Sequence, residues 1–192
     1  DSLRLLRLAP TVMSMVEGWN LISVPYALPD MQKSSLFPTG SSNAFAYEGG
    51  YVVKSVLRHG IGYWLKFGEA QTLELNGNRI SVDTVEVMPG WNMIGSVSQS
   101  LPVPSVVQNP AGIVTSNFFG YAGNYDVAEN IEPGQGYWVR TSRAGKLILG
   151  SSPAGENGIT LANQHQSLTP FNKILVKDKS RHEQVLYWGA GN

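Results

Sequence analysis

Apolar and polar residues alternate along most of the chain in short runs, and glycine, proline and asparagine separate the runs. Thr84–Met88 and Thr72–Leu75 are two such runs. A period of two is typical of β-strands, in which successive side chains point to opposite faces of a sheet. Helical spacing is nearly absent. We expect one or two helical turns only at Pro29–Leu36 and Pro104–Gln108, each beginning with proline.

The alternating runs belong to an internal repeat. Glu17–Val24 (EGWNLISV) returns 72 residues later as Pro89–Ser96 (PGWNMIGS), and Gly62–Lys66 (GYWLK) returns 74 residues later as Gly136–Arg140 (GYWVR). The order of the blocks is the same in both copies, and four of the five tryptophans occupy equivalent positions. Such self-similarity indicates a duplicated structural unit.

The repeat divides the chain into domains. We expect one β unit over residues 1–78 and a second over 79–150, and the polar, glycine-rich stretch at 151–158 indicates a linker over residues 151–170. Two strand patterns in 171–192 indicate a C-terminal β-hairpin. Because an isolated hairpin is marginally stable in water, either it docks on the second repeat or it begins a truncated domain. The expected fold is all-β: two homologous sandwich- or barrel-like units, packed side by side, plus the hairpin.

The Gly-Tyr-Trp strand predicts two faces of different character. In Gly62–Phe67, alternation places Tyr63 and Leu65 on one face and Trp64 with Lys66 on the other, and the second copy has the same pattern. We expect the Trp/cation face to be partly exposed, because a flat ring beside a hydrogen-bonding cation suits stacking on sugars. Alternatively, each tryptophan packs beneath the stem of its own cation. The candidate binding residues are Trp64, Lys66, Trp138 and Arg140.

The Gly-Trp-Asn strand has a different pattern. Trp19 and Leu21 alternate with Asn20 and Ile22, so both faces are largely apolar, which predicts a central strand buried on both sides. We expect Asn20 to hydrogen-bond the backbone of a neighbouring turn, because a buried amide without partners is costly. Asparagine recurs at Asn92, which favours a structural role over chemistry at one site.

Pairs of tyrosines flank two glycine-containing hairpin turns, at Tyr47–Tyr51 and Tyr121–Tyr125. Aromatic side chains at a loop tip are candidates for binding, because loops on a rigid scaffold often carry function. Alternatively, the two tyrosines of each pair pack against each other across the turn. The candidate residues are Tyr47, Tyr51, Tyr121 and Tyr125.

Composition and charge exclude several classes of protein. The 14 Lys and Arg residues balance the 14 Asp and Glu residues, so the chain has no net charge to attract nucleic acid. It has no cysteine, which excludes disulfides and thiolate chemistry. No apolar run reaches the roughly 18 residues of a membrane span, and the first residues lack the pattern of a signal peptide. We therefore expect neither nucleic-acid binding nor membrane insertion.

Catalytic and metal sites are not indicated by the sequence. His59, His165 and His182 are scattered and have no metal-ligand spacing, and neither a nucleophile elbow nor a phosphate-binding loop is present. The acidic stretch at 124–132 lacks the residue order of a calcium loop. We expect no enzymatic activity, no cofactor and no metal.

The blocks Gly-Trp-Asn-(Leu/Met)-Ile, Phe-x-Tyr-x-Gly and Gly-x-Gly-Tyr-Trp-(Leu/Val)-(Lys/Arg) resemble a tandem module of large secreted and cell-surface proteins of bacteria. The resemblance covers residues 8–150, and the first repeat departs from it at Arg58 and His59, where the motif prefers Glu-Pro. Proteins with this module often end in a sorting domain of the type IX secretion class. Ile174–Asp178 more weakly resembles the β segment before that domain. The resemblance implies an extracellular or cell-surface location and names no activity.

Two functional hypotheses follow. The first is a non-catalytic extracellular module that binds a polysaccharide through its repeated aromatic residues, weakly and with little dependence on salt, at two equivalent sites. The second is a structural protein, either a spacer or a subunit of a surface fibre or layer, whose aromatics lie in its core and in contacts with other subunits. Burial of both Trp64 and Trp138 would remove the better sugar platform.

Overall fold

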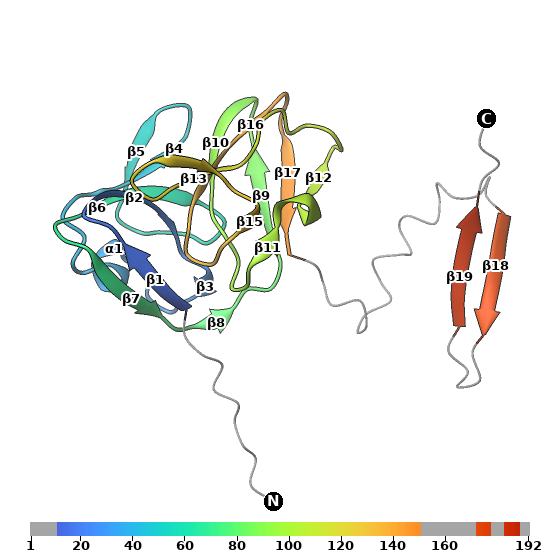
Figure 1. Ribbon diagram of the computed structural model, residues 1–192, viewed down its shortest axis with the longest axis horizontal. Helices are drawn as coiled ribbons and strands as arrows, with labels where there is room; N and C mark the ends of the chain where they lie inside the picture. Colours follow the sequence, from blue (N-terminus) through green and yellow to red (C-terminus); the bar gives the residue numbers. More distant parts are fainter. Residues whose placement is uncertain (1–10, 151–171, 178–182, 189–192) are drawn as a thin grey trace, which may run out of the picture. The chain divides into compact units, whose positions relative to one another are not determined.

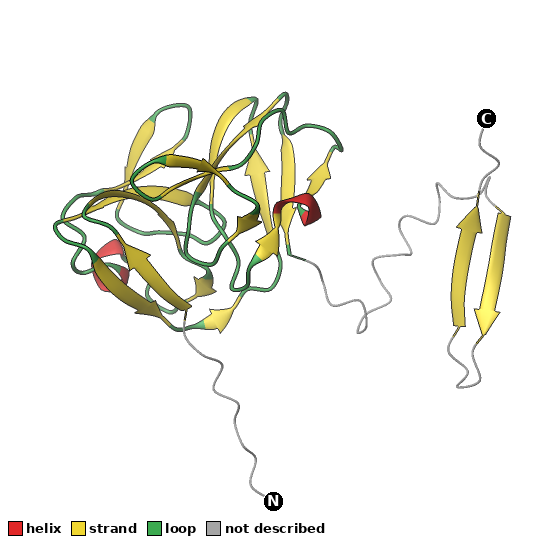
Figure 2. Ribbon diagram, viewed as in Figure 1, coloured by secondary structure: helices red, strands yellow, loops and turns green. Residues whose placement is uncertain are grey.

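The structure, a computed structural model, describes residues 11–150, 172–177 and 183–188. The chain divides into two units, Asp1–Ser152 and Pro153–Asn192, which are described separately. Strands dominate both units (Figure 1, Figure 2), so the prediction of an all-β chain is confirmed. The sheets are open and antiparallel, and none of those in the described residues closes on itself.

The first repeat is built on a four-stranded sheet with two strand pairs packed over one face. Its strands are β1 Thr11–Met15, β2 Gly18–Ser23, β3 Tyr26–Ala27, β4 Ala44–Tyr47, β5 Tyr51–Lys54, β6 Gly62–Phe67, β7 Gln71–Leu75 and β8 Asn78–Arg79. The four-stranded sheet has the order β2-β6-β4-β5, and the pairs are β1-β7 and β3-β8. One short helix, α1 Lys33–Leu36, lies between β3 and β4.

The second repeat forms the same central sheet. Its strands are β9 Asp83–Val87, β10 Gly90–Ile94, β11 Leu101–Pro102, β12 Val107–Asn109, β13 Phe119–Tyr121, β14 Tyr125–Val127, β15 Asn130–Ile131, β16 Tyr137–Thr141 and β17 Gly145–Leu149. The order β10-β16-β13-β14 reproduces that of β2-β6-β4-β5, beside the sheet β12-β17-β9 and the pair β11-β15. A single 3-10 turn, η1 Val103–Ser105, stands near the second expected helix, so both expected helices are only one turn long.

The second unit contains two described strands, β18 Asn172–Lys177 and β19 Glu183–Trp188, which pair antiparallel. These strands fall within the two terminal patterns expected from the sequence. The expected linker at 151–170 lies outside the described residues. In the parts of the chain that the structure describes, no helix is long and apolar enough to cross a membrane.

Each repeat has its own hydrophobic core on one face of its four-stranded sheet. Tyr63, Leu65 and Phe67 of β6 are buried in the first core, and Tyr137 and Val139 of β16 are buried in the second. Burial raises the pKa of Tyr137 to about 12. The faces predicted from alternation along these strands are therefore confirmed.

Two equivalent asparagines form hydrogen bonds with the backbone of the turns that precede β2 and β10. The Asn20 side chain accepts a hydrogen bond from the Val16 N–H at 2.9 Å and donates to the carbonyls of Val16 and Gly18 at 2.8 and 3.1 Å. Asn92 makes the equivalent three contacts at 2.9 to 3.0 Å. Gly18 and Gly90 both have a φ above +90°, which favours glycine in these turns. The predicted hydrogen bonding of asparagine to a turn is confirmed.

The two repeats are joined by reciprocal backbone contacts. The Ser23 N–H donates to the Gly134 carbonyl at 2.8 Å, and the Gly95 N–H makes the equivalent bond to the Gly60 carbonyl at 2.9 Å. Between them, the hydroxyls of Ser23 and Ser96 are hydrogen-bonded at 2.8 Å. Reciprocity of this kind is typical of a twofold dimer interface, here formed within one chain.

Close approach of the two sheets depends on a pair of equivalent glycines. A Cβ at Gly62 would lie 2.7 Å from the Ile94 carbonyl oxygen, and a Cβ at Gly136 would lie 2.9 Å from the Ile22 carbonyl oxygen. The same added atom at Gly136 would lie 3.2 Å from the Cα of Gly62. Because the obstructing atoms are backbone, any larger residue would push the repeats apart.

We predict that Gly136→Ala destabilises the unit by about 1–3 kcal/mol, because the added methyl group overpacks a backbone-to-backbone contact. Thermal or urea unfolding measures the loss. Gly50→Ala is the matched control, since a Cβ there has no neighbour within 4 Å. Equal stability of the two variants would contradict the importance of this contact.

We also predict that Asn20→Ala lowers the free energy of unfolding by about 2 kcal/mol, because it leaves three half-buried groups of the turn without their partners. The exposed Asn117 provides the control, and Asn117→Ala should change stability little. Urea unfolding of both variants tests this, and a small loss for Asn20→Ala would show that water replaces the amide.

Candidate functional site

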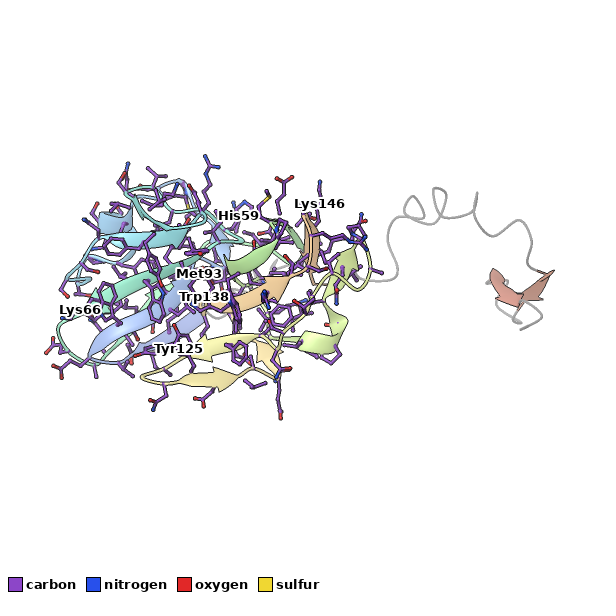
Figure 3. All side chains as sticks on the ribbon, turned by 90° about the horizontal axis from the view of Figure 1, so that it is seen from above. His59, Lys66, Met93, Tyr125, Trp138 and Lys146 are labelled. Carbon is purple, nitrogen blue, oxygen red and sulfur yellow. The ribbon has the colours of Figure 1, made fainter. Side chains whose placement is uncertain are left out.

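A third apolar cluster lies between the two repeats. It contains Leu21 and Trp64 from the first repeat and Met93 and Trp138 from the second. These residues project from the sheet faces opposite to the two separate cores, so the second faces of the sheets meet there. Figure 3 shows Met93 and Trp138 in the middle of the folded unit and Lys66 at its edge.

Trp64 and Trp138 are buried, each only 9% exposed, whereas Lys66 and Arg140 are exposed. The expectation of a partly exposed Trp/cation face is therefore wrong for the tryptophans and right for the cations. The physical reason is that each repeat covers the tryptophan of the other. By our own criterion, these two rings no longer provide an open platform for a sugar.

The covering rings are tyrosines that reach across from the opposite repeat. Tyr47 of the first repeat packs on Trp138 with 4.9 Å between ring centroids, and Tyr121 of the second packs on Trp64 at 4.8 Å. Both contacts are edge-on, an arrangement favoured by the charge distribution of aromatic rings. These two equivalent tyrosine–tryptophan contacts link the repeats to each other.

Trp19 and Trp91 are the tryptophans that reach the surface, at 42% and 45% exposure. In β2, Asn20 and Leu21 are buried beside Trp19. The prediction that this strand is buried on both sides therefore fails at Trp19 and holds at these two neighbours. Trp19 stands near the start of β2, where it packs edge-on against Trp64 at 6.4 Å and is not covered by the other repeat. Trp91 contacts Trp138 in the same way at 6.3 Å.

The hairpin tyrosines pack against each other as the structural alternative predicts. Tyr47 and Tyr51 pair across their turn with ring centroids 5.7 Å apart, and Tyr121 and Tyr125 do so at 5.1 Å. Packing across the turn is therefore confirmed. The outer member of each pair also remains accessible, with Tyr51 at 61% and Tyr125 at 56% exposure.

These rings line two grooves, which we call the first and second grooves. The first groove, of about 470 Å³, is lined by Trp19, Phe45, Tyr51, Trp64, Tyr121 and Tyr125. The second groove, of about 420 Å³, is lined by Tyr47, Trp91, Phe119, Tyr125 and Trp138. Together they form the aromatic face. Each groove combines rings from both repeats, and its volume falls in the range of ligand sites.

Both grooves are uncharged. Among the described residues, all those that line the two grooves are aromatic. Lys66 lies directly opposite Trp19 in the pairing of β2 with β6, and Arg140 lies opposite Trp91 in the pairing of β10 with β16. The two cations therefore flank the grooves at their exposed tryptophans.

Polar groups on the aromatic face are few. Burial raises the pKa of Tyr125, the neighbouring Tyr51 adds to this rise, and the Trp138 indole opposes it. The indole opposes the rise because its N–H approaches the Tyr125 hydroxyl, but the buried Nε1 has no partner at full hydrogen-bond distance among the described residues. The face can therefore stack on apolar surfaces and offer, among the described residues, one buried donor without a full hydrogen bond.

Other candidates from the sequence lie away from the aromatic face. His59 contacts Asp83 of the second repeat at 2.7 Å, while His165 and His182 lie outside the described residues. Within the described part of the chain, no three His, Asp or Glu side chains gather closely enough to hold a metal ion.

Sequence reasoning missed Phe45 and Phe119 as lining residues and assigned Trp19 and Trp91 to the interior. The sequence feature that could have identified the two phenylalanines is the repeated Phe-x-Tyr block. Phe45 lies opposite Trp64 in the pairing of β4 with β6, which places both on one face. Comparison of the chain with models of protein families, with curated proteins and with solved structures found no match.

Proposed function

We propose that this chain is a non-catalytic, extracellular module that binds glycan through its aromatic face. The observation that carries the proposal is the pair of equivalent grooves lined by aromatic rings on one surface. Sugar rings present flat C–H surfaces that stack on such rings, and the tyrosine hydroxyls supply hydrogen bonds. The resemblance of both repeats to a module of secreted bacterial proteins supports the location.

We assign stacking on the sugar to the exposed tryptophans, Trp19 and Trp91, in place of the buried Trp64 and Trp138. Trp19 and Trp91 present accessible ring surface, and each is held edge-on by a buried neighbour, Trp64 or Trp138. Rings fixed by packing lose little conformational freedom when a ligand binds, which favours affinity. Trp64 and Trp138 thus position the exposed rings, and each also lines a groove.

We predict that Trp19→Ala and Trp91→Ala each weaken binding by about five- to thirtyfold, because each removes a central aromatic contact. Affinity electrophoresis in gels of neutral polysaccharides such as hydroxyethylcellulose, xylan and glucomannan measures the change. Val107→Ala, which alters an exposed side chain outside both grooves, is the control and should bind as the parent does. If no polysaccharide retards the parent protein, the glycan proposal is wrong.

A second candidate function, subunit assembly, is favoured by the outer strands of the two central sheets. Among the described strands, β5 and β14 each pair on one side only, and they expose apolar residues, including Val53 and Val127. An exposed apolar edge strand offers unpaired backbone groups to another chain. In a monomeric protein such an edge promotes aggregation, whereas in a fibre or layer it would form the contact between subunits.

For the assembly candidate, we predict concentration-dependent self-association that Val53→Lys abolishes, because a charge on an edge strand opposes pairing. Sedimentation velocity over a hundredfold concentration range measures it, with Val12→Lys as a control at an exposed position outside β5 and β14. A protein that stays monomeric throughout would exclude this candidate and leave the glycan proposal unaffected.

A further inference from the structure

The first and second grooves share a wall. Tyr125 lines both of them. Tyr51 lines the first groove, and its partner across the turn, Tyr47, lines the second, with 5.7 Å between their ring centroids. The boundary between the grooves is therefore made of hairpin tyrosines that belong to the lining. One extended ligand that crosses these tyrosines would therefore stay on the aromatic face.

The lining also restricts the charge of that ligand. Aromatic residues are the only groups that line either groove within the described chain, so no cation inside the grooves would neutralise a carboxylate or sulfate. Burying an unpaired charge against such a surface is costly. Lys66 and Arg140 are exposed to water beside the grooves, where their attraction is screened. An uncharged chain fits this surface best.

The Trp138 indole supplies a specific polar contact. Its Nε1–H is buried, has no hydrogen-bond partner among the described residues, and belongs to a ring that lines the second groove. Buried donors are normally paired, and an unpaired one calls for an explanation. A hydroxyl or ring oxygen of a sugar would provide the missing acceptor.

We infer that the two grooves are halves of one site, which binds a single uncharged glycan chain across Tyr125 and donates a hydrogen bond from Trp138 Nε1 to one of its oxygens. This inference rests on the proposed function and specifies its ligand. It replaces two separate weak sites with one extended site.

Calorimetry with oligosaccharides of increasing length tests the continuity of the site. The probes are the disaccharide and hexasaccharide of the neutral polysaccharide that the gels retain: cellobiose and cellohexaose, xylobiose and xylohexaose, or mannobiose and mannohexaose. We expect one hexasaccharide per protein and an affinity at least tenfold above that of the disaccharide. Hexagalacturonate, an anionic chain of the same length, should bind at least tenfold more weakly.

Equivalent tyrosines provide a matched pair of variants. Tyr125→Ala removes a ring shared by both grooves, whereas Tyr51→Ala removes its counterpart from the first groove only. We expect Tyr125→Ala to lose the gain in affinity from disaccharide to hexasaccharide, and Tyr51→Ala to keep part of it. Thermal unfolding first establishes that both variants are folded.

The indole hydrogen bond has its own readout. In the ¹⁵N–¹H spectrum, the Trp138 Nε1–H signal, assigned by its absence in Trp138→Phe, should move downfield and exchange more slowly when the hexasaccharide binds. Loss of this hydrogen bond in Trp138→Phe should lower affinity about fivefold. Trp64→Phe, at the equivalent position, controls for the loss of ring area and should lower it less.

The outcomes separate the two claims. If no neutral polysaccharide retards the protein, the proposed function itself fails. If binding occurs but two hexasaccharides bind independently, if hexagalacturonate binds as well as the neutral chain, or if the Trp138 signal is unchanged, the inference of a single uncharged chain held by Trp138 is overturned while glycan binding stands.

Discussion

The structure depends on one close contact, the approach of two backbones at Gly62 and Gly136. Only because neither residue has a side chain can the β2-β6 and β10-β16 edges come near enough to exchange hydrogen bonds. That approach brings the second faces of the two central sheets together and buries Trp64 and Trp138 between them. The covering of Trp64 and Trp138 by tyrosines of the opposite repeat follows from this contact.

The aromatic face belongs to the pair of repeats and to neither one separately. Tyr47 covers a tryptophan of the second repeat, and Tyr121 covers a tryptophan of the first, so each groove has walls from both. Duplication therefore did more than double a site. It created a surface that a single repeat lacks, while each repeat kept a core of its own.

Features that arise within one repeat could be predicted from the sequence, and features that arise between repeats could not. Alternation correctly predicted the buried face of β6, and the cost of burying an amide correctly predicted the role of Asn20. The exposure of Trp64 depends on a tyrosine more than 50 residues away in the other copy. Trp19 is exposed because the second repeat covers Trp64 but leaves Trp19 accessible. The alternation of apolar and polar residues within one strand does not contain that information.

The reciprocal contacts between the repeats also have a consequence for direction. A glycan chain is polar, with a reducing end and a non-reducing end, whereas a twofold axis reverses direction. A chain that crosses the aromatic face would therefore meet largely equivalent rings first in one sense and then in the opposite sense. The repeats differ at the flanking cation, Lys66 in one and Arg140 in the other. Such differences between the copies are what would give the chain a preferred orientation.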